Sequence, residues 1–348
     1  MVTPTWVQGH NDNNNITSES FTHTITSGSF GGRMKLIKQG DGKLILPTGT
    51  HKHTGRTEVW GGTLAVDGYL TSSPLWLNRH TTLETSDLRV PRGIDMKYGS
   101  TLRIGTDTKA GKLNTSNLDL GFGSIVEIDL FADMTADYIV ATGLNIEIKD
   151  WTDGPEHLRP ILRINAHPAE GEETIPQGKY LIGRIGIINN DITEGLIEYM
   201  TILGLENMKK ELLYENGKLY LNVVAYQPGN KTWVGDENNL AIWDLDNTKI
   251  FSSASAAQDV FVPGDAVLFD DSAKSSDVFI TGRLMPSSVT FDNSTLDYTL
   301  SGDGQIVGDA KLVKNGTGTL TVNNINSYTG GTYINGGKLV AGVFANNV

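Results

Sequence analysis

The sequence predicts an all-β chain folded as a parallel β-helix, a solenoid of short strands, and three observations support this. A glycine-anchored unit occurs twice, at residues 35–66 and 311–341. Strand-like segments follow one another too closely for a sandwich, and their junctions recur as G-x-L and G-G-x-L instead of hairpin dipeptides. Internal repeats of this size are typical of solenoids and arrays.

The two copies align with an offset of 276 residues before their middle (311 − 35) and 275 after it (330 − 55). Glycine is the residue that enters left-handed backbone conformations without steric cost, so the shared glycines predict sharp corners between strands. The glycines of the two units are Gly40, Gly42, Gly55, Gly61, Gly62, Gly316, Gly318, Gly330, Gly331, Gly336 and Gly337.

Between the repeats, short apolar segments such as 75–77 and 101–104 predict strands, and Ile125–Leu130 alternates strictly, as half-buried strands do. Residues 204–214 place apolar side chains at helical spacing and predict a loop or a short helix. Residues 150–178 hold four prolines and four glutamates, so we expect an excursion from the coils there, with a strand at 161–164.

The motif K-x-G-x-G-x-L followed by S-Y-T-G-G-T-x-I-x-G-G-x-L spans Lys314–Leu339, and Lys38–Leu64 matches it more loosely. It resembles the autotransporter-associated β-strand repeat of bacterial passenger domains. The resemblance implies a right-handed parallel β-helix on a secreted or surface protein, and it implies no catalytic residue. The first copy departs from the motif by carrying His51, Lys52 and His53 where the second has Ser327 and Tyr328.

A second duplication predicts two modules. Thr5-Trp6-Val7 recurs as Thr232-Trp233-Val234, which suggests a structural role for Trp6 and Trp233 at the start of each module. We therefore expect one β-helix module at residues 1–230 and the start of a second, truncated module at 231–348. The chain is then part of a longer protein, whose adjoining β-helix or other domains are its first expected partners.

Composition narrows the function classes. The chain of 348 residues has no cysteine, which excludes disulfides and thiolate metal sites, and its net charge of −12 argues against nucleic acid and anionic lipid as partners. It has no apolar run long enough to span a bilayer. No signal peptide is visible at the start, so an export signal would lie upstream, and the expected location is extracellular or the cell surface.

The favoured function is a non-catalytic extracellular spacer or binding segment of a larger bacterial surface or secreted protein, with glycans as the candidate contacts. The predicted binding residues lie in or near the excursion. Trp151 offers a flat aromatic platform for a sugar ring. His157, Arg159, Arg163 and His167 form a basic cluster that an acidic polysaccharide would meet, although neighbouring glutamates are the more expected partners of these side chains.

Two alternatives stay open. An adhesin passenger segment would recognise host glycans or protein. A polysaccharide lyase or hydrolase would need converging carboxylates to hold Ca²⁺ and a base to remove a proton. Asp129, Asp133 and Asp137 have a suitable spacing of four, but we expect them to lie in a turn and face solvent.

No metal site or cofactor is predicted, and Ca²⁺ is the one candidate ion. His51 and His53 share one face of a strand, but no third ligand is apparent, so a solvated loop is expected there. Asp265, Asp270 and Asp271 lack the spacing of a calcium loop, and we expect them to form turns.

Overall fold

The structure of the chain is a computed structural model that describes residues 22–147, 159–188, 200–205, 208–236 and 241–342. The described part is built from strands, turns and loops, without a helix. No helix long and apolar enough to cross a membrane is therefore found there. The chain divides into two compact units, Met1–Ala225 and Tyr226–Val348, and each is described by itself.

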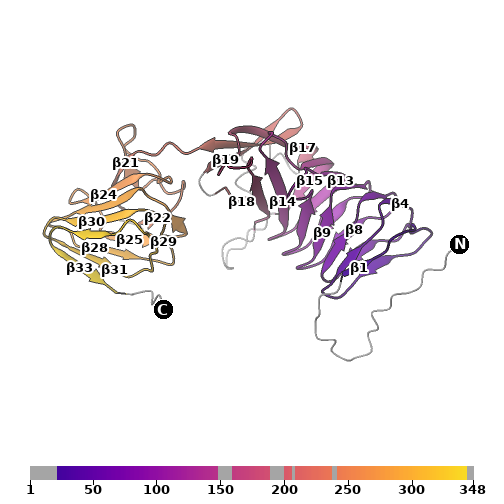
Figure 1. Cartoon of the computed structure of the whole chain (residues 1–348), viewed down its shortest axis with the longest axis horizontal. Helices are drawn as coiled ribbons and strands as arrows, with labels where there is room; N and C mark the ends of the chain where they lie inside the picture. The colour runs from indigo at the N-terminus through magenta and orange to yellow at the C-terminus, as the bar shows by residue number, and fades with distance from the viewer. Residues whose placement is uncertain (1–21, 148–158, 189–199, 206–207, 237–240, 343–348) are drawn as a thin grey trace, which may run out of the picture. The chain divides into compact units, whose positions relative to one another are not determined.

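The first unit contains two main sheets of stacked strands, coloured from indigo through magenta toward orange in Figure 1. One sheet has the strand order β1-β3-β6-β9-β12-β14-β16-β18, and all of its pairs are parallel. Its strands are β1 (Thr22–Thr24), β3 (Lys43–Ile45), β6 (Thr63–Ala65), β9 (Thr82–Thr85), β12 (Thr101–Ile104), β14 (Ile125–Phe131), β16 (Ile161–His167) and β18 (Thr201–Leu203).

The other sheet of this unit has the main order β19-β20-β17-β15-β13-β11-β8-β5-β2, with β4, β7 and β10 paired beside it. Its strands are β2 (Leu36–Lys38), β4 (Gly49–His51), β5 (Thr57–Val59), β7 (Gly68–Leu70), β8 (Leu75–Leu77), β10 (Asp87–Val90), β11 (Ile94–Met96), β13 (Lys112–Leu120), β15 (Tyr138–Ile146), β17 (Gly178–Ile188), β19 (Met208–Glu215) and β20 (Lys218–Ala225).

The strand register shows how the chain coils. Thr63 pairs with Thr82, and Thr82 with Thr101, so each of these coils takes 19 residues (82 − 63 and 101 − 82). Along β12 the residues are alternately half-buried and buried, as expected for one strand face turned inward. Stacked leucines such as Leu64, Leu83 and Leu102 are fully buried and form the core. The predicted parallel β-solenoid is confirmed.

The helical prediction at residues 204–214 is wrong. Residues 208–215 form β19, an antiparallel partner of β20, which in turn pairs antiparallel with β17. The connection between β19 and β20 contains Asn216 and Gly217, both with positive φ (51° and 74°), which is the backbone of a tight hairpin turn. The Asn-Gly dipeptide is therefore a hairpin signal here. The segment forms a strand of this hairpin although Met208 and Leu212 have helical spacing.

The predicted excursion at 150–178 is shorter than the composition suggests. Ile161–His167 is a regular strand that pairs with β14 over its full length, so this part stays in the stack. Residues 168–177 connect β16 to β17 outside the sheets, and most of them are exposed. Residues 150–158, the rest of the predicted excursion, lie outside the described part.

The second unit is a smaller stack, orange to yellow in Figure 1. Its sheets have the orders β23-β21-β24-β27-β30-β32, β22-β25-β28-β31-β33 and β26-β29. The strands are β21 (Asn230–Trp233), β22 (Ile242–Trp243), β23 (Phe251–Ser252), β24 (Ala266–Asp270), β25 (Asp277–Ile280), β26 (Arg283–Leu284), β27 (Ser288–Asp292), β28 (Tyr298–Ser301), β29 (Gln305–Ile306), β30 (Lys311–Asn315), β31 (Thr319–Val322), β32 (Thr332–Ile334) and β33 (Lys338–Ala341).

The second unit has an aromatic core. Phe269 on β24 stacks on Phe291 on β27, with ring centroids 4.5 Å apart and an interplanar angle of 11°. Trp233 is fully buried and its indole N–H donates to the carbonyl oxygen of Ser275 at 2.8 Å. The structural role predicted for Trp233 is confirmed, whereas Trp6 lies outside the described residues.

Candidate functional site

Each glycine unit spans two stacked coils. In the first copy β2 pairs with β5, and β3 pairs with β6; in the second copy β30 pairs with β32, and β31 with β33. The corner between the first two strands of each copy therefore lies against the corner between the last two strands. The repeated motif is thus a packing unit of two adjacent corners.

Glycine at these corners is required by close backbone approach. Gly62 has φ = 60°, and a Cβ there would lie closer to the carbonyl oxygen of Gly42 than real side chains come. Gly337 has φ = 67° and meets the carbonyl oxygen of Gly318 in the same way. The left-handed conformation and the contact both exclude a side chain at these two positions.

A buried lysine closes each corner. Lys38 is 7 % exposed, and its Nζ donates to the carbonyl oxygens of Gln39 at 2.9 Å, Gly40 at 2.6 Å and Gly61 at 2.9 Å. The last of these bonds joins one coil to the next. Burial lowers the pKa of Lys38, and the nearby charge of Asp41 opposes this shift.

The equivalent lysine of the second copy, Lys314, is completely buried. Its Nζ donates to the carbonyl oxygens of Asn315 and Gly316, and burial lowers its pKa as well. The sequence motif contains both lysines, but the motif alone does not predict that their ammonium groups are buried. The matching positions of Lys38 and Lys314 in the two copies were the available signal.

The binding residues predicted near the excursion are not brought together in the described part. Trp151 and His157 lie outside it. Arg159 is exposed. The guanidinium of Arg163 forms an ion pair of 2.6 Å with Glu127, the residue beside it on β14. The internal pairing expected for Arg163 is present, but its partner comes from the preceding coil instead of from the neighbouring glutamates.

His51 and His53 are both completely buried, so the predicted solvated loop is wrong. His51 accepts a hydrogen bond at Nδ1 from the backbone N–H of Phe30 at 3.2 Å, and Nε2 of His53 lies 2.8 Å from the hydroxyl of Thr57. Burial lowers the pKa of each imidazole. These rings are packed in the interior of the first coils. The polar sequence His-Lys-His led to the wrong prediction that they are exposed.

The three carboxylates considered for a lyase have different surroundings. Asp133 lies on an exposed turn and accepts hydrogen bonds from the backbone N–H and hydroxyl of Thr135, as expected. Asp129 and Asp137 are buried instead, which corrects the prediction that they face solvent. Asp137 accepts backbone N–H bonds from Gly111 at 2.7 Å and Asp129 at 2.8 Å, and burial raises its pKa to about 7.

The turn role predicted for Asp265, Asp270 and Asp271 is confirmed. Asp265 accepts backbone N–H bonds from Gly229 and Val262, and Asp270 accepts one from Ser272. Asp271 reaches the next coil, where it accepts N–H bonds from three consecutive residues, 294–296. These bonds, led by those from Leu296 and Thr295, lower the pKa of Asp271 to about 2.

Asp271 provides a pH prediction. Its carboxylate is favoured in the folded state, so its contribution to stability is complete above the ordinary value of 3.8 and is lost as the pH falls through about 2. We expect Asp271→Asn to lower the melting temperature at pH 5 and to approach the wild type at pH 2. Asp277→Asn, at an exposed position on β25, is the matched control. An equal deficit of the Asp271 variant at both pH values would contradict the prediction.

Two tryptophans outside the predicted site border a shallow groove of about 260 Å³ on the first unit. Trp60 follows β5 and is 54 % exposed, and its indole N–H donates to Glu58 at 2.8 Å. Trp76 on β8 lies under the guanidinium of Arg56, 4.2 Å from the ring centroid. The ammonium of Lys97 lies 5.4 Å from the same ring. The groove therefore combines an exposed indole with charged side chains at its border.

A second, larger groove of about 420 Å³ lies where residues 168–177 leave the coils. Its lining is mostly apolar and includes Ile175, Pro176, Met208 and Ala225. Gln177 at its border accepts a hydrogen bond from the backbone N–H of Ala225 at 2.9 Å. This groove has few free polar groups that could orient a small ligand.

Two comparisons with known proteins bear on these features. Residues 36–66 and 312–341 match the passenger-associated-transport-repeat family. The chain is also 24% identical over 332 residues to "Adhesin BmaC autotransporter" of Brucella suis biovar 1 (strain 1330), an alignment that covers 88% of this chain and 10% of that protein. The chain thus spans about a tenth of this relative's length.

The matched residues coincide with the two pairs of stacked corners, each with its buried lysine and close-packed glycines. The resemblance expected from the glycine motif is therefore confirmed by an independent match at both copies. The chain is a β-solenoid protein with two stretches that match the passenger-associated-transport-repeat family, one in each of its compact units.

Proposed function

We propose that this chain is a segment of an autotransporter passenger, displayed on the bacterial surface or secreted, where it acts as a non-catalytic scaffold of an adhesin-like protein. The observation that carries the proposal is the use of the repeat motif inside the fold. Gly62 and Gly337 allow stacked corners to approach closely. The ammonium group of Lys38 joins one coil to the next, and that of Lys314 bonds the carbonyl oxygens of its own corner. The name of the relative, an adhesin autotransporter, supports the same role.

A scaffold role follows from the backbone ladder. Each coil satisfies the N–H and C=O groups of its strands on neighbouring coils, so length is added without a new type of core. The outer side chains and loops then remain available for contacts. The adjoining domains of the longer protein are the first proposed partners, since coils stack most readily on further coils.

Surface display can be tested on intact cells that produce the full-length protein. Antibodies raised against residues 1–348 are expected to label intact cells or to detect the segment in the culture medium, and external protease is expected to remove the cell-bound signal. A cytoplasmic protein detected in parallel serves as the control for cell integrity. Labelling that requires cell lysis would refute the proposal.

Glycan contact is a second proposed function, and the groove at Trp60 and Trp76 favours it. An exposed indole packs on a pyranose ring by apolar burial. Lys97, which also lines the groove, supplies the ammonium group proposed to bond a sugar hydroxyl. This places the proposed contact on β5, β8 and β11, away from the residues predicted from the sequence.

Binding is tested by native electrophoresis through gels that contain plant, host or microbial polysaccharides. We expect selective retardation by one glycan, and Trp60→Ala should weaken it at least about tenfold because a central aromatic contact is lost. Tyr333→Ala removes an exposed aromatic residue of the second unit and should have no effect. Trp151→Ala and Arg159→Ala test the site predicted from the sequence. Uniform mobility in every gel would refute glycan contact, and the spacer role would be the remaining proposal.

A further inference from the structure

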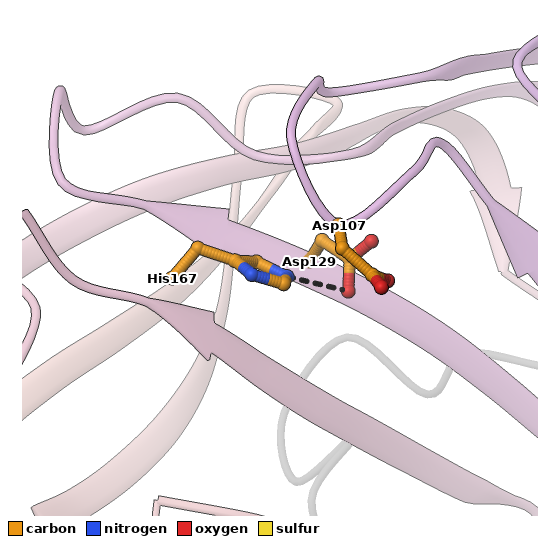
Figure 2. A group of neighbouring side chains, drawn as sticks. All are labelled: Asp107, Asp129 and His167. Atoms are coloured by element: carbon orange, nitrogen blue, oxygen red, sulfur yellow. Dashed lines mark ion pairs between the residues drawn. The ribbon is translucent and has the colours of Figure 1, made fainter.

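Three side chains with metal-binding atoms meet in the first unit, shown in Figure 2. Asp107 lies on the turn after β12, Asp129 lies on β14, and His167 is the last residue of β16. One ligand atom from each lies within 4.8 Å of the others. The three residues come from successive coils and are 22 and 38 positions apart in the sequence (129 − 107 and 167 − 129).

Asp129 is the buried member of this cluster. Its side chain is only 2% exposed, and Oδ1 accepts a hydrogen bond from the amide of Asn165 at 2.9 Å. Its other oxygen, Oδ2, is buried without a hydrogen-bond partner among the described residues. Burial of a carboxylate oxygen without a partner costs free energy. A bound cation would remove this cost at Oδ2.

His167 is held so that its Nε2 points at Asp129. Nε2 lies 3.2 Å from Oδ1 of Asp129, and the imidazole stacks on Phe131, with centroids 4.9 Å apart and an interplanar angle of 17°. Asp107 closes the cluster from the solvent side, since its side chain is 72% exposed. It also forms an ion pair of 2.8 Å with Arg103. An ion could therefore enter from solvent by displacing one exposed side-chain contact.

We propose that Asp107, Asp129 and His167 form a binding site for a divalent transition-metal ion of the Zn²⁺ type, with water completing the coordination. Two carboxylates and one imidazole match the ligands that Zn²⁺ uses, whereas Ca²⁺ takes oxygen ligands alone. The ion would fasten the turn at Asp107 to β14 and β16, and so stiffen three successive coils. This proposal does not depend on the proposed function.

The test is titration of the full chain, freed of metal with EDTA and dialysed, with Zn²⁺, Mn²⁺ and Ca²⁺ in separate calorimetric experiments. One Zn²⁺ per chain is expected to bind and to raise the melting temperature, because a ligand that binds only the folded state stabilises it. Ca²⁺ is expected to bind more weakly. Co²⁺ in place of Zn²⁺ should give a visible absorption band that reports direct coordination.

Variants separate this site from an ordinary ion pair. Asp107→Asn changes an exposed side chain and His167→Gln removes the nitrogen ligand, and each should weaken Zn²⁺ binding at least about tenfold. Asp133→Asn, on a nearby exposed turn, is the control and should bind as the wild type does. If no Zn²⁺-dependent change occurs, or if both ligand variants bind as the control does, the cluster is an ion pair between His167 and Asp129 and the proposal is overturned.

Discussion

Replacing Gly62 by alanine is expected to disrupt the first glycine unit, the stretch at residues 36–66 that matches the repeat family. A left-handed conformation costs a residue with a side chain roughly 1–2 kcal/mol. The new methyl group would also press against the carbonyl oxygen of Gly42 in the coil below, and forced overpacking adds about 1–3 kcal/mol. Because coils of a solenoid contact mainly their neighbours, the loss should concentrate in residues 36–66. Hydrogen exchange followed by mass spectrometry should show faster exchange in β3 and β6.

Gly40 offers a control in the same corner. It has φ = 76°, but a Cβ there would have no atom within 4 Å. Gly40→Ala therefore tests the backbone conformation alone, and Gly62→Ala tests that conformation together with the clash. If the two variants show the same melting temperature and the same exchange, the close contact between the stacked corners contributes nothing and the packing argument fails.

Replacing Lys38 by methionine should have the second large effect. The variant keeps most of the side-chain volume but leaves the carbonyl oxygens of Gln39, Gly40 and Gly61 without their donor. Gln39 and Gly40 are exposed and Gly61 is half-buried, so the cost lies below or near the lower end of the roughly 1–3 kcal/mol of an unpaired buried acceptor. Loss of the bond to Gly61 also removes a link between two coils. We expect a lower midpoint in urea unfolding for the variant.

The opposite outcome has a clear physical meaning. Burying an ammonium group is itself costly, and an apolar replacement can be neutral or stabilising when that cost dominates. Equal or higher stability of Lys38→Met would show that dehydration of the ammonium outweighs its hydrogen bonds. Lys112→Met, at an exposed position on β13, controls for the change of net charge. Lys314→Met removes the donor to Asn315 and Gly316 in its own corner, whereas Lys38→Met also removes a bond between coils, so we expect a smaller loss from Lys314→Met.

The candidate sites could be predicted only in part from the sequence. The sequence shows that residues 60 and 76 are tryptophans. The residues around each of them do not show that Trp60 and Trp76 border one groove with Lys97. The excursion drew attention to Arg163, yet the structure pairs this residue with Glu127 on β14. Both contacts join coils, and the chain positions of such partners are set by the register between coils.

The sequence by itself determines the repeated unit, its glycine corners and the parallel solenoid. Each corner and each strand is specified by a few adjacent residues, and these residues recur along the chain. What only the tertiary structure decided is which residues of one coil lie on the next. Coil lengths change from 19 residues between Thr82 and Thr101 to 36 between Ile125 and Ile161, and to 40 between Ile161 and Thr201. A fixed period therefore cannot bring Asp107, Asp129 and His167 together. Their proximity depends on the hydrogen-bonded register between coils and on loop length. Neither can be predicted from the spacing of residues in the sequence.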